Sequence, residues 1–456
     1  MLLRSGFTVR WLCGAKAWLA TIVAIAFLIS FGSAPATAAD TTGASAAGHL
    51  GATTCGSSVC HGAAQPWRNS PIQQNEFLIW IKQDPHANAY KTLLSDQAKQ
   101  IARNLGLPNA HEAPACLNCH ADNVPLAQRG RAFSIADGVS CETCHGGAQQ
   151  WLGLHVSGAS SHAQNVASGM YPMDDPVARG ERCLSCHMGN SERWLDHRIM
   201  GAGHPRLRFE LDTFTSAQPA HFRVDADYRK RKQVSSPAKT WMIGQALAAA
   251  TFLDGLSDSR RNKPGLFPEL VFYNCHSCHH SMTERKFERA VDGSVPPGMP
   301  RLQDISLVLL QIATEVMDAD LASQLSRNLG RLHEVTASQT SNQAGAARAL
   351  RSDVNRALPR LQQEPSKAQV QQLLDRLFAL ASKPGYRSFE TAEQVTMAFG
   401  SMLAHLRQQN LVTDAQHQKA ATALERVYKC VENDARYSIA AFDSAIQELK
   451  KSLPIL

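Results

Sequence analysis

Five cysteine pairs in this chain are each followed directly by a histidine. Four pairs have the spacing C-x-x-C-H, and the first pair has four residues between its cysteines. This order indicates covalent attachment of a c-type haem, because two thiols add to the vinyl groups and the next residue places an imidazole on the iron. The cysteines are Cys55, Cys60, Cys116, Cys119, Cys141, Cys144, Cys183, Cys186, Cys275 and Cys278, and the histidines are His61, His120, His145, His187 and His279. The sequence therefore predicts five covalently bound haem c groups.

Zinc binding and disulfide formation are the other common uses of closely spaced cysteines. Two C-x-x-C pairs can supply four thiolates to a structural zinc ion, and exported chains often pair their cysteines as disulfides. Neither use requires a histidine directly after the second cysteine, yet all five pairs have one. The longer loop of the first pair contains Gly56 and two serines, which make it pliable enough to bulge outward. We therefore count this motif with the other four.

The first 38 residues have the pattern of an export signal. Arg4, Arg10 and Lys16 accompany an uncharged apolar run over 17–31, and small residues over 36–38 offer a cleavage site. The run is short for a membrane span, so we expect cleavage rather than a retained anchor, and no transmembrane span afterwards. Because haem is attached to cysteine outside the cytoplasm, the signal and the motifs together predict a periplasmic protein.

The formal net charge of +7 does not imply a nucleic-acid partner. Removal of the signal takes away three basic residues, and each haem adds two negatively charged propionates. Buried charges must be paired, so we expect much of the Lys and Arg surplus to neutralise propionates.

The motifs divide the chain into two regions of different character. All five fall between residues 55 and 279, which is too little chain to wrap each haem in its own domain. We predict a loop-rich pentahaem domain over 39–298, packed around closely stacked haems. Over 299–456 no motif occurs and apolar residues recur at helical intervals, so we predict an all-α domain of about five helices. The expected fold class is mainly α.

Several local signals place individual elements. We predict helices over 95–107 and 366–383 and a helix start at Ser236 and Pro237. In contrast, 190–231 has few helical signals and suits an irregular segment lying over haem edges. Three histidines of the C-terminal region fit no ligand spacing and are expected at the surface: His333, His405 and His417.

An iron held by one histidine needs a sixth ligand or keeps an open site. Ten further histidines lie between residues 49 and 280, so several are expected to bind iron: His49, His86, His111, His155, His162, His197, His204, His221, His276 and His280. Ligation by two histidines suits electron transfer, because the coordination hardly changes when the electron arrives. Axial methionine is a known alternative, but buried packing suits Met170, Met188 and Met200 better. We expect His49 in a flexible N-terminal segment.

Several stretches around the motifs are similar to one protein family. They are DPHANAY over 84–90, CLNCH over 116–120, DGVSCETCHG over 137–146 with Trp151 and His155, CLSCH over 183–187, HRIMGAGHP over 197–205, FPEL over 267–270 and CHSCHH over 275–280. These stretches resemble the cytochrome c-554 family of multihaem cytochromes, over roughly residues 50–290. The resemblance implies a periplasmic electron carrier with closely stacked haems, and some relatives are enzymes of nitrogen or sulfur compounds. The founding member has four haems, whereas this chain has five motifs.

The resemblance also implies the distal ligands. The best candidates are His86, His155, His197 and His204. His280 is the fifth, because a C-x-x-C-H-H arrangement, as in small tetrahaem cytochromes, lets the second histidine bind a neighbouring haem. The alternative for each is a hydrogen bond to a propionate, and His111 and His162 are reserves.

Two functions compete on this basis. The first is electron transfer between redox partners, either cytochromes or quinol-linked membrane complexes. The second is an oxidoreductase acting on a small nitrogen or sulfur compound at one open haem. The sequence favours the first, because no motif ends in the lysine of pentahaem nitrite reductase and the histidines are numerous enough to close every iron. A third hypothesis makes the C-terminal helical domain a docking module that selects the partner.

Overall fold

The structure is a computed structural model that describes residues 48–68, 70, 72–262, 269–279, 300–338 and 342–453. In these ranges the chain is mainly helical, as predicted, and contains two isolated β-bridges but no strand. The predicted signal segment and His280 lie outside the described residues. The described residues belong to one compact unit.

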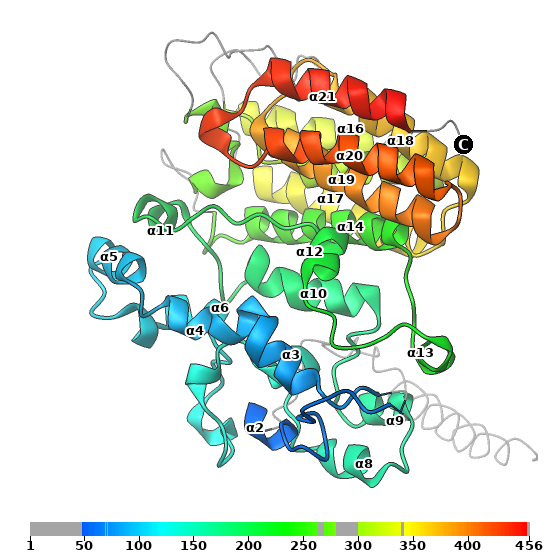
Figure 1. The fold of residues 1–456 in the computed structure, drawn as a ribbon. Coiled ribbons are helices and arrows are strands. Elements are labelled where there is room, and N and C mark those ends of the chain that lie inside the picture. Colours follow the sequence, from blue (N-terminus) through cyan, green and yellow to red (C-terminus); the bar gives the residue numbers. More distant parts are fainter. Residues whose placement is uncertain are drawn as a thin grey trace, which may run out of the picture. The chain divides into compact units, whose positions relative to one another are not determined.

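The motif-bearing region consists of short helices joined by loops, followed by one long helix (Figure 1). Its α-helices are α2 (Ala52–Cys55), α3 (Glu76–Gln83), α4 (Ala89–Thr92), α5 (Asp96–Leu105), α6 (Pro114–His120), α7 (Cys141–His145), α8 (Leu152–Ser157), α9 (His162–Ala167), α10 (Pro176–His187), α11 (His197–Gly201), α12 (Leu211–Ala217), α13 (Ala226–Arg231) and α14 (Pro237–Ser257). Short 3₁₀ turns are η1 (Pro85–Asn88), η2 (Ala110–Glu112), η3 (Leu126–Gln128), η4 (Ile135–Asp137), η5 (Leu270–Phe272) and η6 (Cys275–Ser277). The segment over 190–231, expected to be irregular, contains three short helices separated by loops.

The C-terminal region contains seven α-helices within the described ranges, where we expected about five. They are α15 (Ile305–Met317), α16 (Ala319–Ala337), α17 (Gln343–Leu361), α18 (Lys367–Ala381), α19 (Phe389–Gln408), α20 (Asp414–Cys430) and α21 (Ile439–Ser452), with one 3₁₀ turn, η7 (Asp434–Arg436). Asp318 alone separates α15 from α16. Because the apolar pattern continues across this single residue, the sequence does not indicate where α15 ends and α16 begins.

Helix ends form where side chains satisfy backbone groups that the helix itself leaves unpaired. The Ser95 side chain caps the start of α5, and Gly106 ends this helix in the left-handed conformation with a φ of 70°. Ser236 caps α14 in the same way, and Ser366 begins α18 with a reciprocal capping box. These three predicted helix starts are confirmed.

Helix α14 lies at the centre of the apolar core. Its Trp241, Met242 and Leu253 side chains are completely buried, as expected for a helix that is apolar on nearly all sides. It packs against α10 and α12 and also against α15, α17 and α19. The domain boundary at residue 298 stays a prediction. Helix α14 precedes this boundary and packs against helices on both sides of it. No helix in the described ranges combines the length and hydropathy that crossing a membrane requires.

Two histidines of the C-terminal helices are buried in this core. His333 and His405 are 4% and 1% exposed, so the prediction that they lie at the surface is wrong; His417 is half-buried. Nε2 of His333 lies 2.8 Å from Oδ2 of Asp304, which Arg301 also contacts at 3.0 Å. Such partners offset the free energy lost when an imidazole leaves water.

Replacing Asp304 by Asn is expected to destabilise these helices by roughly 3 kcal/mol, because Arg301 and His333 lose their buried partner. Burial raises the pKa of Asp304, but Arg301 and His333 outweigh burial and lower this pKa to about 2. The stabilisation is therefore present above the unfolded pKa of about 4 and is lost as the pH falls toward 2. Hydrogen exchange of the α15 amides measures both effects. Asp375→Asn, on the exposed face of α18, is the control, and equal exchange in the two variants would contradict the expectation.

Candidate haem-binding sites

The motif cysteines lie in short helices or turns that end near the motif histidines. Helices α6, α7 and α10 end at His120, His145 and His187, respectively. A helical turn places residues i, i+3 and i+4 on one side, so both thiols and the imidazole can reach one ligand. Cys55 ends α2, and Cys275 begins η6. All ten motif cysteines are free thiols in the structure, so none of them forms a disulfide.

Each motif histidine faces one histidine from outside the motifs. The ring centroids of the five pairs lie between 6.0 and 6.3 Å apart. We number the pairs by motif: site 1 is His61 with His155, site 2 is His120 with His204, site 3 is His145 with His221, site 4 is His187 with His86, and site 5 is His279 with His197.

This spacing is the one that a metal ion held between two imidazoles requires. A metal–imidazole bond is about 2 Å long and the ring centre lies about 1 Å behind the bonding nitrogen, so two rings on opposite sides of an ion have centroids about 6 Å apart. The same spacing recurs at all five motifs, although the partners come from different loops and helices. Each histidine pair could therefore hold a haem iron between its two imidazoles.

Hydrogen bonds at Nδ1 leave Nε2 of both site 2 imidazoles free for a metal. Nδ1 of His120 donates to the Ala89 carbonyl oxygen at 3.1 Å, and Nδ1 of His204 donates to the Pro205 carbonyl oxygen at 2.7 Å. Metal-bound histidines commonly donate their other ring N–H to a carbonyl or carboxylate, which fixes the tautomer and the ring orientation.

Carboxylates take this role at sites 1 and 4. Nδ1 of His61 lies 3.0 Å from Oε2 of Glu76, and Nδ1 of His86 lies 2.8 Å from Oδ1 of Asp84. The Gln218 side-chain amide donates to the other oxygen of Asp84 at 2.9 Å. A carboxylate on the far nitrogen makes an imidazole a stronger donor to a metal. An iron held at site 1 or site 4 would therefore be stabilised in its oxidised state more than one held at site 2.

Glu76→Gln is accordingly expected to raise the reduction potential at site 1 by roughly 60 mV, a tenfold change in a one-electron equilibrium. The physical reason is the loss of negative charge from the His61 N–H partner. A redox titration followed by absorbance measures the shift. Glu112→Gln beside His111, which belongs to no pair, is the matched control. Identical titration curves for the two variants would contradict the assignment of Glu76.

The predicted distal ligands can now be placed. His86, His155, His197 and His204 each lie opposite a motif histidine, and the fifth such ring belongs to His221. The sequence predicts His280 for this position, and that residue lies outside the described residues. His221 was one of the ten histidines considered, but it lies in a segment without a motif. The one feature of the sequence that pointed to His221 as a ligand was the number of histidines in that segment.

The remaining described histidines of this region lie beside carboxylates rather than beside motif histidines. The pairs are His49 with Asp122 at 2.8 Å, His111 with Glu112 at 3.7 Å, His162 with Asp174 at 2.8 Å and His276 with Glu390 at 3.0 Å. The sequence makes His111 and His162 reserve candidates for distal ligands. In the structure each of them lies beside a carboxylate instead.

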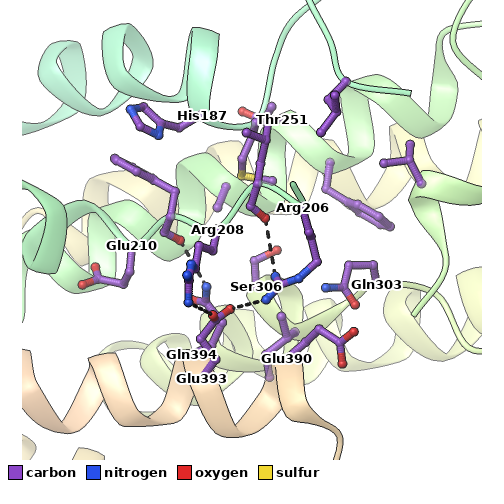
Figure 2. A pocket seen from close by; sticks show the side chains of 18 of the residues that line it. His187, Arg206, Arg208, Glu210, Thr251, Gln303, Ser306, Glu390, Glu393 and Gln394 are labelled. Carbon is purple, nitrogen blue, oxygen red and sulfur yellow. Dashed lines mark hydrogen bonds and ion pairs between the residues drawn. The ribbon is translucent and has the colours of Figure 1, made fainter. Parts of the chain in front are cut away.

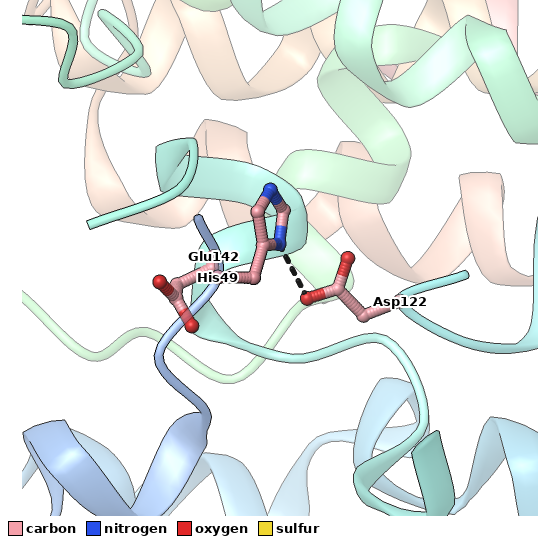
Figure 3. A group of neighbouring side chains, drawn as sticks. All are labelled: His49, Asp122 and Glu142. Carbon is pink, nitrogen blue, oxygen red and sulfur yellow. Dashed lines mark hydrogen bonds and ion pairs between the residues drawn. The ribbon is translucent and has the colours of Figure 1, made fainter. Parts of the chain in front are cut away.

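His49 is fixed in place, so the expectation that it lies in a flexible segment is wrong. Its N–H donates to the Gln128 carbonyl, and its own carbonyl accepts from the Gly130 N–H, both at 2.7 Å. Its ring points to Asp122, near Glu142 (Figure 3). The three side chains lie close enough together to hold a metal ion. However, the hydrogen bonds that Glu142 accepts indicate another role for this carboxylate.

Both oxygens of Glu142 already accept hydrogen bonds. Oε1 accepts from the Leu50 and Ala148 N–H groups at 2.8 and 2.7 Å, and Oε2 accepts from the Gly51 N–H at 2.7 Å. Glu142 is 1% exposed and lies between the two cysteines of the third motif. It therefore anchors that motif to the backbone on either side, and these bonds compete with a cation for the carboxylate.

Four arginines around the motifs have a buried Nε without a hydrogen-bond partner among the described residues. The atoms are Nε of Arg179, Arg182, Arg193 and Arg261. Buried donors are rarely left unpaired, and an arginine fork suits carboxylates. These side chains could therefore hold haem propionates, so this part of the structure also fits the cofactor.

A cavity of about 160 Å³ is lined by His187 of site 4 and Cys275 of the fifth motif (Figure 2). Arg206 and Arg208 both point to Glu393, with nitrogen–oxygen distances of 2.9 and 3.3 Å. Glu393 belongs to α19, so a C-terminal helix contributes directly to the surroundings of the motifs.

The same helix holds the fifth motif. Glu390 is 1% exposed, and its Oε1 lies 3.0 Å from Nδ1 of His276, between the two motif cysteines. Burial raises the pKa of Glu390, but the hydrogen bond from His276 and the charge of Arg206 outweigh burial and lower this pKa to about 2. Glu390 is therefore an ionised partner that positions this motif.

Cysteines of different motifs lie side by side. The Cys55 thiol lies close enough to that of Cys141 to shift its pKa, and the thiols of Cys119 and Cys186 affect each other in the same way. Burial raises the pKa of the Cys144 thiol to about 12, and the nearby thiols of the fourth motif add to this effect. Attachment points are thus close between motifs one and three, two and four, and three and four.

Residues 54–146, which contain the first three motifs, match the family model described as Cytochrome c554 and c-prime. Cytochrome c-554 of Nitrosomonas europaea is 28% identical over 147 residues, which are 29% of this chain and 54% of that protein. The chain thus spans about half the length of this curated relative. No solved structure matches the chain. The resemblance to the cytochrome c-554 family is confirmed over the matched residues, and this family implies covalently bound haem c.

Proposed function

We propose that this protein is a pentahaem c-type cytochrome that transfers electrons between redox partners. A haem c is attached at each of the five motifs, and the iron of each has two histidine ligands, those of sites 1 to 5. Each haem iron supplies reversible uptake of one electron. The observation that carries the proposal is the pairing of every motif histidine with a second imidazole at 6.0 to 6.3 Å.

The second imidazole is what favours a carrier over an enzyme. Chemistry on a small nitrogen or sulfur compound needs an open position on a metal. A tethered imidazole has a high effective concentration at its metal and excludes dilute external ligands. With a partner at each of the five motifs, the side chains of this protein close the positions that a substrate would need.

The contacts between motif cysteines support closely stacked haems. The first motif adjoins the third, the third adjoins the fourth, and the fourth adjoins the second. His187 and Cys275 line the same cavity, which supports a fifth haem close to the fourth. Haems attached at motifs in this order would let an electron cross the protein in several short steps, each from one haem to its neighbour.

The compartment and the partners follow from the same chemistry. We propose a periplasmic location, which the predicted export signal and the haem motifs support. In the periplasm its partners are redox proteins, either cytochromes or quinol-linked membrane complexes. We propose no nucleic-acid partner. The C-terminal helices contribute Glu390 and Glu393 to the surroundings of the motifs, so they position the fifth motif in addition to any role in partner choice.

Carbon monoxide binding tests the proposal. The reduced protein is expected to bind carbon monoxide poorly, because each iron already has two imidazole ligands. It is expected to exchange electrons with a soluble cytochrome and to show no turnover of nitrite, hydroxylamine or tetrathionate with a reduced dye. Stoichiometric carbon monoxide binding at one haem, together with turnover that stops when that haem is blocked, would make the protein an oxidoreductase instead.

A further inference from the structure

The segment over 221–232 carries a concentration of positive charge. It contains five basic and two acidic residues. Both acidic side chains are engaged within the segment, since Asp225 caps the start of α13 and Asp227 pairs with Arg231. Three exposed basic side chains have no carboxylate partner among the described residues: Arg223, Arg229 and Lys230. The segment therefore presents unpaired positive charge to solvent.

Exposed apolar side chains accompany this charge. Phe222 and Val224 are 44% and 42% exposed and follow His221 of site 3. The Phe222 ring stacks on Tyr228 with centroids 5.4 Å apart, which holds it in place at the surface. On α8, Leu154 and Val156 are 47% and 62% exposed. Grouped exposed apolar side chains mark interaction surfaces.

Contacts connect these two sets of residues. Asp174 accepts a hydrogen bond from the Gln233 N–H at 3.1 Å and pairs with His162, at the start of α9, at 2.8 Å. Ser160 in turn connects α9 to α8, since its hydroxyl lies 3.0 Å from the Leu154 carbonyl oxygen and 2.8 Å from Oδ1 of Asn165. The basic segment thus begins with His221 of site 3 and is connected through Asp174 and α9 to α8, which carries His155 of site 1.

We propose that 221–232 and the exposed side chains of α8 form a docking surface for an acidic, soluble redox protein. This inference rests on the proposed function. Unpaired arginine and lysine side chains steer an acidic partner and accelerate its encounter at low salt. Apolar contact beside His155 and His221 then brings the redox centre of the partner close to sites 1 and 3. We favour a protein over an anionic membrane, because the apolar side chains flank the histidines of these two sites.

The test compares two double charge reversals that change the net charge equally. Arg229→Glu with Lys230→Glu alters the proposed surface, and Lys419→Glu with Lys429→Glu alters exposed positions on α20. Electron exchange with an acidic soluble cytochrome c is followed by stopped flow, and affinity for it by calorimetry. The first variant is expected to react about tenfold more slowly at low ionic strength and to bind more weakly, whereas the second is unchanged. The difference should disappear at high salt.

Reduced lumiflavin, a small uncharged reductant, separates this inference from the proposed function. If lumiflavin reduces both variants normally but they react equally with the acidic cytochrome, the docking surface is wrong. If lumiflavin reduces no haem in the unaltered protein, the carrier function itself fails. Loss of binding to phosphatidylglycerol vesicles in the first variant, with unchanged reaction with the cytochrome, would assign the surface to a membrane and also overturn the proposal.

Discussion

Replacing His221 by Ala is expected to convert one haem from low spin to high spin without detaching it from the chain. His221 is the ring opposite His145, with centroids 6.3 Å apart, so its loss opens one axial position. The two cysteines and the histidine of the third motif remain, and these hold the haem. Electron paramagnetic resonance of the oxidised variant should show a new high-spin signal equivalent to one haem.

His280→Ala is the matched control, because the sequence predicted His280 as the fifth distal ligand. If the pairs at sites 1 to 5 are the ligands, this variant keeps every haem in the low-spin state. His86→Ala and His204→Ala should each behave like His221→Ala, since both residues lie opposite a motif histidine. A high-spin signal in His280→Ala and none in His221→Ala would return the fifth ligand to His280.

Glu142→Leu is expected to lower the free energy of unfolding by roughly 4 kcal/mol. The substitution leaves two buried N–H groups and one partly buried N–H group without an acceptor, and each unsatisfied group costs about 1–3 kcal/mol. These groups belong to Leu50, Gly51 and Ala148, so residues on both sides of the third motif lose their anchor. Urea unfolding of the holoprotein, followed by the Soret band, measures the change.

Two further variants show whether the carboxylate acts as an acceptor of hydrogen bonds. Glu142→Gln keeps one carbonyl oxygen and should have an intermediate urea midpoint. Glu192→Leu removes an exposed carboxylate and should leave the midpoint almost unchanged. If Glu142→Leu unfolds at the same urea concentration as Glu192→Leu, the anchoring role of Glu142 is wrong.

Features that depend only on residues close together in the sequence could be predicted from it. The haem motifs are local, because attachment uses two thiols and an imidazole within one short stretch. The starts of α5, α14 and α18 are also local, since a single serine side chain satisfies the first free N–H groups of each helix.

Distal ligands depend on the tertiary fold and were harder to predict. His86, His155, His197 and His204 could be named because they lie in stretches that resemble a known family. His221 lies in a loop before α13 without such a stretch, and only the folded chain brings it to His145. The burial of His333 was missed for a related reason, because its partner Asp304 lies 29 positions earlier in the chain.

The number of covalently bound haems tests the central claim most directly. Acid and acetone remove haem that is held only by ligation, whereas thioether-linked haem stays on the polypeptide. The mass of the denatured holoprotein is then predicted to exceed that of its polypeptide by five haem groups, one for each motif of the chain. A mass that corresponds to four or fewer haems would contradict a pentahaem cytochrome.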